Sequence, residues 1–315
     1  MHITKTLQLL ILPFIFLLTA TITTVHAQEK SSEELKKTIN DSTTIPNNVV
    51  EVRALDYAFI APDSIPSGWV TFRMTNKGKE THYFQLSRLP EGRTYQEFLH
   101  TFAQPVDSLQ QLLLAGKIDT TEAEQTVARI TPDWVANGLF KNLGGGVANL
   151  APGRTTQTTI KMEPGTYVMS CILKSPNRKT HASQGTESAS YRKKENTDAS
   201  PPEPDVTICT SGHEVTTEGT LRAGKQTVAY HVDKSSAEMD DFYWSALLAR
   251  IESDADVNEL RQANLLQNPP PVDFLGGLEY VAPGKTAYTE LDLKPGRYAW
   301  VMHGQRDTVR TFTIE

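Results

Sequence analysis

The sequence predicts an all-β protein made of two tandem β-sandwiches, each with a helical insertion. The first observation is an internal repeat: the segment Ala151–Met169 recurs as Ala282–Trp300, with Ala-Pro-Gly, a second Pro-Gly pair and a tyrosine in the same places. The second is the alternation of apolar and polar residues in short stretches, which is typical of strands with one face in a core. The third is the Pro-Gly punctuation between these stretches, which marks turns. Short strands at a steady spacing favour a sandwich or barrel.

The other elements follow from the same comparison of the two repeats. The segment Val50–Gly68 recurs more weakly as Val206–Gly224, and the first repeat carries extra residues between about 91 and 141. Capping-box patterns at Ser108–Gln111 and Thr121–Glu124 predict that these extra residues are helical. The second repeat is expected to have a shorter helical segment within residues 245–267.

The first 27 residues are typical of an export signal. Lys5 precedes an apolar run from Leu7 to Val25, and Ala27 provides the small residue expected at a cleavage site. The alternative is an uncleaved helix, because the run is long enough for a membrane anchor. We expect a signal peptide (1–27), a flexible segment (28–47), a first domain (48–190), a linker (191–204) and a second domain (205–315). The expected location is therefore periplasmic or secreted, with no membrane span after cleavage.

Charge and motifs exclude several classes of function. The formal net charge is -6, and no basic cluster occurs, which argues against a nucleic-acid partner. No H-E-x-x-H or G-x-S-x-G motif occurs, so we expect that the protein is not an enzyme. The two cysteines, Cys171 and Cys209, are the remaining candidates for chemistry, and an exported protein permits a disulfide between them.

The most specific pattern lies in the first repeat. Asn76 and Gly78 precede His82 in an N-x-G-x-x-x-H pattern, the stretch Gly165–Cys171 reads G-x-Y-x-x-x-C, and His181 follows ten residues later. This layout resembles the cupredoxin (blue copper, plastocyanin/azurin-like) superfamily in a tandem-domain exported form. The resemblance implies two cupredoxin-like Greek-key sandwiches and a mononuclear copper site with His82, Cys171 and His181 as ligands. Thiolate and imidazole donors suit copper in an electron-transfer site.

The sequence also departs from the family. Thr186 stands where the family has its weak axial methionine, and Gln184 or a backbone carbonyl is the candidate replacement. In the second repeat, Met302 takes the place of Cys171, and the place of His82 falls near residues 240–242. The second domain is therefore expected to lack copper ligands, so the protein binds one copper ion at most.

Two main readings stay open at this point. In the first, the protein is an exported cupredoxin-like protein, with copper binding and electron transfer through the first domain conditional on Cys171 being free. Its partner would be a protein redox partner or ligand that the sequence does not identify. In the second, it is a metal-free binding or structural protein with a Cys171–Cys209 disulfide, a bridge that contributes about 3–4 kcal/mol. The two exclude each other because both need the Cys171 sulfur.

A third reading, a two-domain copper oxidase or nitrite reductase, is disfavoured by the remaining histidines. Such enzymes need a further copper ion held by histidines at a domain interface. His100, His213, His231 and His303 show no paired His-x-His spacing.

Overall fold

A computed structural model describes residues 48–139, 143–176, 179–184, 190–196, 198–212, 214–238, 244–262, 271–303 and 308–315. The predicted signal peptide (1–27) and N-terminal segment (28–47) lie outside these residues. Within the described ranges, no helix is both long enough and apolar enough to cross a membrane.

Strands dominate the described chain, in two sets that we call the first half (β1–β8) and the second half (β9–β16). The first half contains β1 (Val49–Leu55), β2 (Ala58–Ile60), β3 (Ser64–Asn76), β4 (His82–Arg88), β5 (Leu143–Leu150), β6 (Thr155–Met162), β7 (Tyr167–Ser170) and β8 (Ser190–Asn196). The second half contains β9 (Val206–Ser211), β10 (Glu214–Glu218), β11 (Gly224–Val232), β12 (Ser245–Ile251), β13 (Phe274–Glu279), β14 (Thr286–Leu293), β15 (Gly296–His303) and β16 (Thr308–Ile314).

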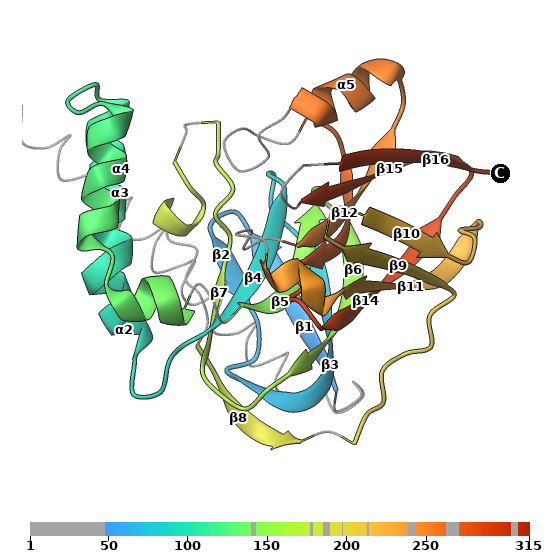
Figure 1. Ribbon diagram of the computed structural model, residues 1–315, viewed down its shortest axis with the longest axis horizontal. Helices are drawn as coiled ribbons and strands as arrows, with labels where there is room; N and C mark the ends of the chain where they lie inside the picture. The colour runs from blue at the N-terminus through green and yellow to red at the C-terminus, as the bar shows by residue number, and fades with distance from the viewer. Residues whose placement is uncertain are drawn as a thin grey trace, which may run out of the picture. The chain divides into compact units, whose positions relative to one another are not determined.

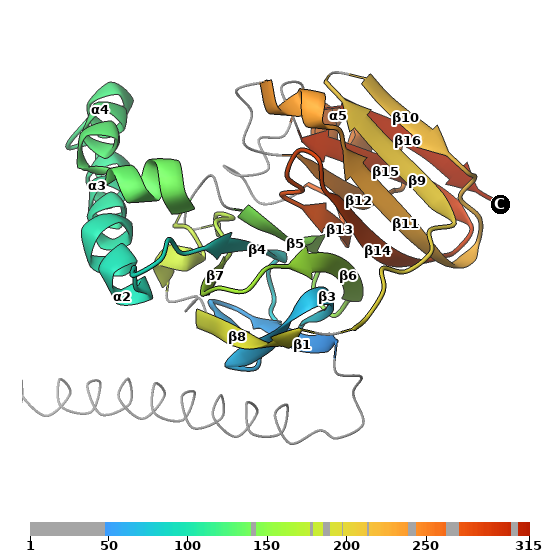
Figure 2. The same cartoon turned by 60° about the horizontal axis from the view of Figure 1, so that its bottom comes forward.

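The strands form two sheets, each of which continues from one half into the other. One sheet has the order β2-β1-β3-β6-β14-β11-β9-β10, and the other has the order β8-β7-β4-β5-β13-β12-β15-β16. The halves meet where β14 pairs with β6 and where β13 pairs with β5, both antiparallel. Figure 2 shows β9, β11 and β14 of the first sheet in front of β12 and β15 of the second.

The core lies between the two sheets. Burial alternates along β1 and β14, as the alternating sequence predicts. Phe72 of β3 and Phe84 of β4 are fully buried, and their rings meet edge to face with centroids 5.5 Å apart. Burying such rings from both sheets is the main contribution to holding a sandwich together. The predicted all-β class with β-sandwich halves is therefore confirmed.

The two halves share one pairing scheme. In the first half, β1 pairs with β2 across a two-residue turn and runs parallel to β3, with Val50 opposite Phe72. In the second half, β9 pairs with β10 across a turn of the same length and runs parallel to β11, with Val206 opposite Val228. This register agrees with the upstream alignment of the two sequence repeats.

Helical insertions occur where the sequence predicts them. Between β4 and β5 lie α2 (Tyr95–Phe98), the π-helical η1 (Leu99–Ala103), α3 (Gln104–Leu114), α4 (Thr120–Ile130) and the π-helical η2 (Trp134–Leu139). Figure 1 shows α3 and α4 side by side as a hairpin. The second half has α5 (Asp254–Gln262) between β12 and β13, and the short 3-10 turns are η3 (Ala182–Gln184) and η4 (Lys234–Glu238).

Three sequence-based details differ from the structure. Ser108 lies inside α3 and donates its hydroxyl to the Gln104 carbonyl, so it does not cap that helix. Helix α4 is capped by Asp119, two residues before Thr121, and the Asp119 carboxylate accepts the Glu122 N–H, a free amide of the first turn. Strand β8 occupies residues 190–196, which the sequence assigned mostly to the linker, and it pairs with β7 and with the start of β3.

Candidate copper centre

His82 is delivered to the site by the loop between β3 and β4. Asn76, at the end of β3, is fully buried and donates its side-chain amide to the carbonyls of Leu150 (2.7 Å) and Glu80 (2.8 Å). Its side-chain oxygen accepts the Gly78 N–H at 2.9 Å. A Cβ atom at Gly78 would lie 2.8 Å from Nε2 of His82, so this position has no room for a side chain. Asn76 and Gly78 of the N-x-G-x-x-x-H pattern therefore fix the conformation of the loop that places His82 at the start of β4.

Cys171 and His181 are joined by a loop that closes on itself. Cys171 directly follows β7, and its carbonyl accepts the Ala182 N–H at 3.0 Å. The His181 N–H donates to the Leu173 carbonyl at 2.8 Å. These two backbone bonds bring His181 back beside Cys171, ten residues earlier in the chain. Both side chains are buried, as is that of His82.

The three predicted residues converge on one point. The Nδ1 atoms of His82 and His181 are 3.0 Å apart, and Sγ of Cys171 lies 3.4 Å from Nδ1 of His181. All three donor atoms lie within 4.8 Å of one another. Two imidazole nitrogens that bind one zinc-sized ion at about 2.0–2.1 Å lie at most about 4.2 Å apart. The observed spacing therefore has room for one shared ion, and this is the one such group found among the described residues.

Burial sets the ionisation of these groups. Burial is the largest cause that lowers the pKa of His82, to about 4, with repulsion from His181 adding to it. Burial also lowers the pKa of His181, although the neighbouring carboxylates oppose this. Both imidazoles are therefore neutral near pH 7 and able to offer a lone pair to a metal.

The surroundings of Cys171 favour the protonated thiol. Burial raises the pKa of Cys171 to about 12, although the backbone amides of Tyr83 and Leu173 donate to the sulfur and oppose the shift. A thiolate at this place therefore needs a positive ion beside it. One thiolate and two neutral imidazoles are soft and borderline donors, and this donor set fits copper.

Two carboxylates that sequence reasoning did not identify lie next to the site. Oε2 of Glu80 lies 2.9 Å from Nε2 of His181, and Oδ1 of Asp56 lies 3.4 Å from Nε2 of His82. Glu80 occupies a variable position of the N-x-G-x-x-x-H pattern, and Asp56 lies in the turn between β1 and β2. Their relation to the histidines depends on how loops meet in space, so no spacing in the sequence indicates it.

The alternative of a Cys171–Cys209 disulfide is wrong in this structure, because both cysteines are free. Cys171 lies against His181, whereas Cys209 lies in β9, opposite His231 of β11. Thr186, which stands where the cupredoxin family has its axial methionine, lies outside the described residues. Gln184 donates its side-chain amide to the Ser175 hydroxyl at 2.8 Å.

The second half has apolar residues in place of the ligands. Arg88 lies opposite Tyr167 in the first half, and Arg250 lies opposite Tyr298 in the second. Counting back six residues from each arginine pairs His82 with Trp244, which corrects the sequence-based placement near residues 240–242. Met302 takes the place of Cys171, as the downstream repeat predicts. Trp244 and Met302 are both buried.

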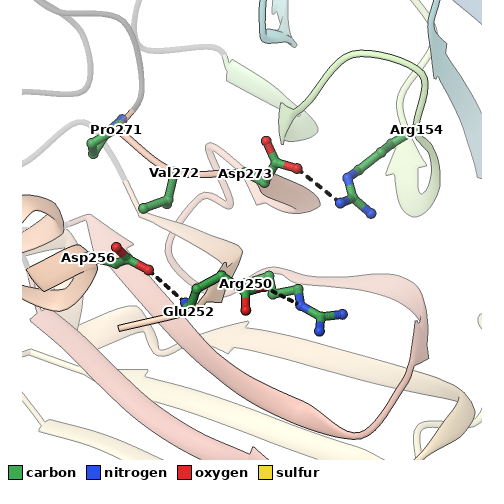
Figure 3. Close-up of a pocket in the computed structure, with 7 residues that line it drawn as sticks. All are labelled: Arg154, Arg250, Glu252, Asp256, Pro271, Val272 and Asp273. Atoms are coloured by element: carbon green, nitrogen blue, oxygen red, sulfur yellow. Dashed lines mark hydrogen bonds and ion pairs between the residues drawn. The ribbon is translucent and has the colours of Figure 1, made fainter. Parts of the chain in front are cut away.

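A surface pocket of about 490 Å³ lies apart from this cluster (Figure 3). Its lining residues are Arg154, Arg250, Glu252, Asp256, Pro271, Val272 and Asp273. Arg154 is paired with Asp273 (3.1 Å) and Arg250 with Glu252 (2.9 Å), so the charges that line the pocket already compensate one another.

No family model and no curated protein matches the sequence. Among solved structures, the chain is similar to an auracyanin from Roseiflexus castenholzii (19% identity, 47% of this chain and 97% of that chain, TM-score 0.27). It is similar to auracyanin A, a blue copper protein from Chloroflexus aurantiacus (16% identity, 46% and 98%, TM-score 0.26). It is also similar to a blue copper oxidase from Nitrosomonas europaea (13% identity, 85% of each chain, TM-score 0.23). These TM-scores are low, and the cupredoxin-like fold rests on the chain's own strand order and motifs.

The expectation that the protein is not an enzyme is contradicted. A multicopper oxidase and a nitrite reductase from Thermus scotoductus, like the blue copper oxidase, are similar over 85% of this chain, with identities of 12% and TM-scores of 0.23 and 0.19. The expectation relied on missing linear motifs. His82 and His181 meet although 99 residues separate them, so the absence of a contiguous catalytic motif does not exclude catalysis. We therefore withdraw the exclusion of catalysis.

Proposed function

We propose that this protein binds one copper ion through His82, Cys171 and His181 and exchanges electrons with a protein redox partner through it. The observation that carries the proposal is the convergence of two neutral imidazole Nδ1 atoms and one buried thiol within 4.8 Å. Copper alternates between Cu(I) and Cu(II), so a copper ion bound here would serve as a one-electron redox centre. The three ligands, and the residues that hold them in place, then have separate roles.

The ligands act as a rigid set. His82 is held by the loop that Asn76 braces, and His181 is held by the backbone bonds of its own loop. Because neither imidazole has to move far to reach a shared ion, little rearrangement accompanies a change in copper charge. A small rearrangement is the property that favours fast electron exchange in a thiolate–imidazole site.

The proposal includes the domain division and location predicted from the sequence. Residues 48–196, which include β8, would form the copper-bearing domain, 197–204 the linker and 205–315 a domain without copper ligands; the linker is then shorter than the 191–204 expected from the sequence. Removal of residues 1–27 would leave the protein in the periplasm or outside the cell. In the periplasm or outside the cell, the protein would meet both copper ions and a redox partner.

Copper titration of the reduced protein tests the proposal. We expect one equivalent of Cu(II) to produce an intense thiolate-to-copper absorption band, with loss of one of the two titratable thiols. Cys171→Ser and His82→Ala should abolish the band. The matched control is Cys209→Ser, which removes the other thiol and should leave the band intact. If the wild-type protein keeps both thiols free and shows no band at one equivalent of copper, the proposal is wrong.

A further inference from the structure

The imidazole edges that face away from the donor cluster both meet carboxylates. Nε2 of His181 lies 2.9 Å from Glu80, and Nε2 of His82 lies 3.4 Å from Asp56. In each histidine, therefore, one ring nitrogen faces the cluster and the other faces an acidic side chain. A partner of this kind orients a metal-binding imidazole and raises its basicity.

The carboxylates are themselves held in place. Asp56 accepts the backbone N–H groups of Lys79 (2.7 Å) and Glu80 (3.3 Å). Glu80 accepts the Tyr57 hydroxyl at 2.9 Å. Tyr57 has a φ of 68°, a left-handed conformation that a residue with a side chain rarely adopts. The turn that carries Asp56 and Tyr57 is therefore held in an uncommon conformation that directs both side chains to this cluster.

Both carboxylates act as hydrogen-bond acceptors toward the donors around them, the Tyr57 hydroxyl and the Lys79 and Glu80 amides. Burial alone would raise the pKa of Glu80, but hydrogen bonds from Ser175, His181 and Tyr57 outweigh it and lower the pKa. Burial likewise opposes ionisation of Asp56, and backbone hydrogen bonds from Lys79 and Glu80 outweigh it and lower the pKa. An ionised carboxylate accepts hydrogen bonds only. Because Nε2 of each imidazole is the ring nitrogen that lies against a carboxylate oxygen, the geometry favours a proton on Nε2.

This tautomer leaves both Nδ1 atoms without a proton, as acceptors only. Their separation is 3.0 Å, which is unfavourable for two bare acceptors and favourable when both bind the same cation. The two negative charges also offset the copper charge differently in its two states. Reduction adds one electron from the partner and turns Cu(II) into Cu(I), which lowers the attraction between the metal and both carboxylates.

We propose that Asp56 and Glu80 are positioning residues that fix the Nε2–H tautomers of His82 and His181 and stabilise Cu(II) relative to Cu(I). The inference rests on the proposed copper function. It assigns this centre a lower reduction potential than the same three ligands would have without the carboxylates. Glu80 has the larger effect because its oxygen lies closer to the imidazole.

The second half supports this assignment. The two-residue turn between β9 and β10 corresponds to the turn that carries Asp56, and its first residue is Gly212. Where Trp244 and Met302 replace the ligands, the carboxylate in the turn is absent as well. The carboxylate is thus not required by the shared turn, and it occurs in the half that has the donor cluster.

The test uses Asp56→Asn and Glu80→Gln, which remove charge and keep shape. The control is Glu51→Gln, because Glu51 lies on β1, the strand that leads into Asp56, and pairs with Arg73 at 2.9 Å, away from the cluster. With copper bound, both test variants should have a higher reduction potential than the wild type, in the order Glu80→Gln above Asp56→Asn. Cu(II) affinity should fall by about 10–100-fold, and Cu(I) affinity should fall less. Glu51→Gln should match the wild type in all three measurements.

A second measurement needs no copper. Nitrogen NMR of the metal-free wild type should show both histidines protonated at Nε2, and Glu80→Ala should let His181 populate both tautomers. If the wild type binds copper but Glu80→Gln and Asp56→Asn keep its potential, the inference is overturned and the proposed function stands. If the wild type does not bind copper, the proposed function fails. A wild-type proton on Nδ1 of His181, with Nε2 bare, would overturn the inference by itself.

Discussion

The two halves of this protein have the same strand pairing and different contents at the same place. In the first half, His82 and Cys171 face a shared point, and Asp56 lies next to Nε2 of His82. In the second half, the corresponding residues are Trp244, Met302 and Gly212. Trp244 and Met302 are 4% and 5% exposed, so apolar side chains fill the place of the donor cluster. The sandwich therefore supports the site but does not require it, and the chemistry lies in a few side chains on a shared frame.

The largest effect we expect is the complete loss of copper chemistry in Cys171→Ser. The sulfur is the one donor whose charge balances the metal, and a serine hydroxyl is a poor ligand for copper. Visible absorption and electron paramagnetic resonance of the copper-loaded variant measure the result. A copper signal with the same intensity and shape as in the wild type would show that the thiol is not a ligand.

A second prediction concerns rebuilding the site in the second half. The double variant Trp244→His/Met302→Cys should lose about 3–5 kcal/mol of unfolding free energy, because it replaces large buried side chains with small polar ones. It should not bind a second copper ion, since the following segment, Gly304–Asp307, contains no counterpart of His181. Urea unfolding and copper stoichiometry test both statements. Two copper ions per chain would mean that the frame alone determines the site.

A third prediction contrasts Asn76 with Val232, which takes its place in the second half. Asn76→Leu removes three hydrogen bonds and leaves two carbonyls and one amide without their partner, so a loss of about 2–4 kcal/mol is expected. Copper affinity should fall as well, because the loop before His82 loses its brace. Val232→Ala should lower the unfolding free energy without changing copper affinity. Equal copper affinity in Asn76→Leu and the wild type would contradict the bracing role.

The smallest effect is expected at the surface ion pair that links the halves. Arg154 and Asp273 are 3.1 Å apart, with 41% and 64% of their side chains exposed. Solvent screens such a pair, so Asp273→Asn should change the unfolding free energy by less than about 1 kcal/mol. Chemical denaturation at low and high salt measures this. A loss of several kcal/mol would show that the junction depends on this pair more than on the β6–β14 and β5–β13 contacts.

Sequence reasoning identified the three clustered residues because each lies in a local pattern. His82 ends the N-x-G-x-x-x-H motif, Cys171 ends a strand that begins at a Pro-Gly turn, and His181 follows at a short distance. It did not find Asp56, which precedes His82 by 26 residues and approaches it only through a turn between two other strands. It also misplaced the counterpart of His82, because the connection between β11 and β12 differs in length from that between β3 and β4.

The sequence by itself determined the alternating strands, the repeated turns, the helical insertions and the candidate ligands, since these depend on local periodicity and spacing. Only the tertiary structure decided that each sheet continues through both halves, that Cys171 lies against His181 and not against Cys209, and that two carboxylates face the imidazoles. Those features depend on contacts between residues far apart in the chain. Burial, which shifts the ionisation of His82 and Cys171, exists only after the two sheets have closed over them.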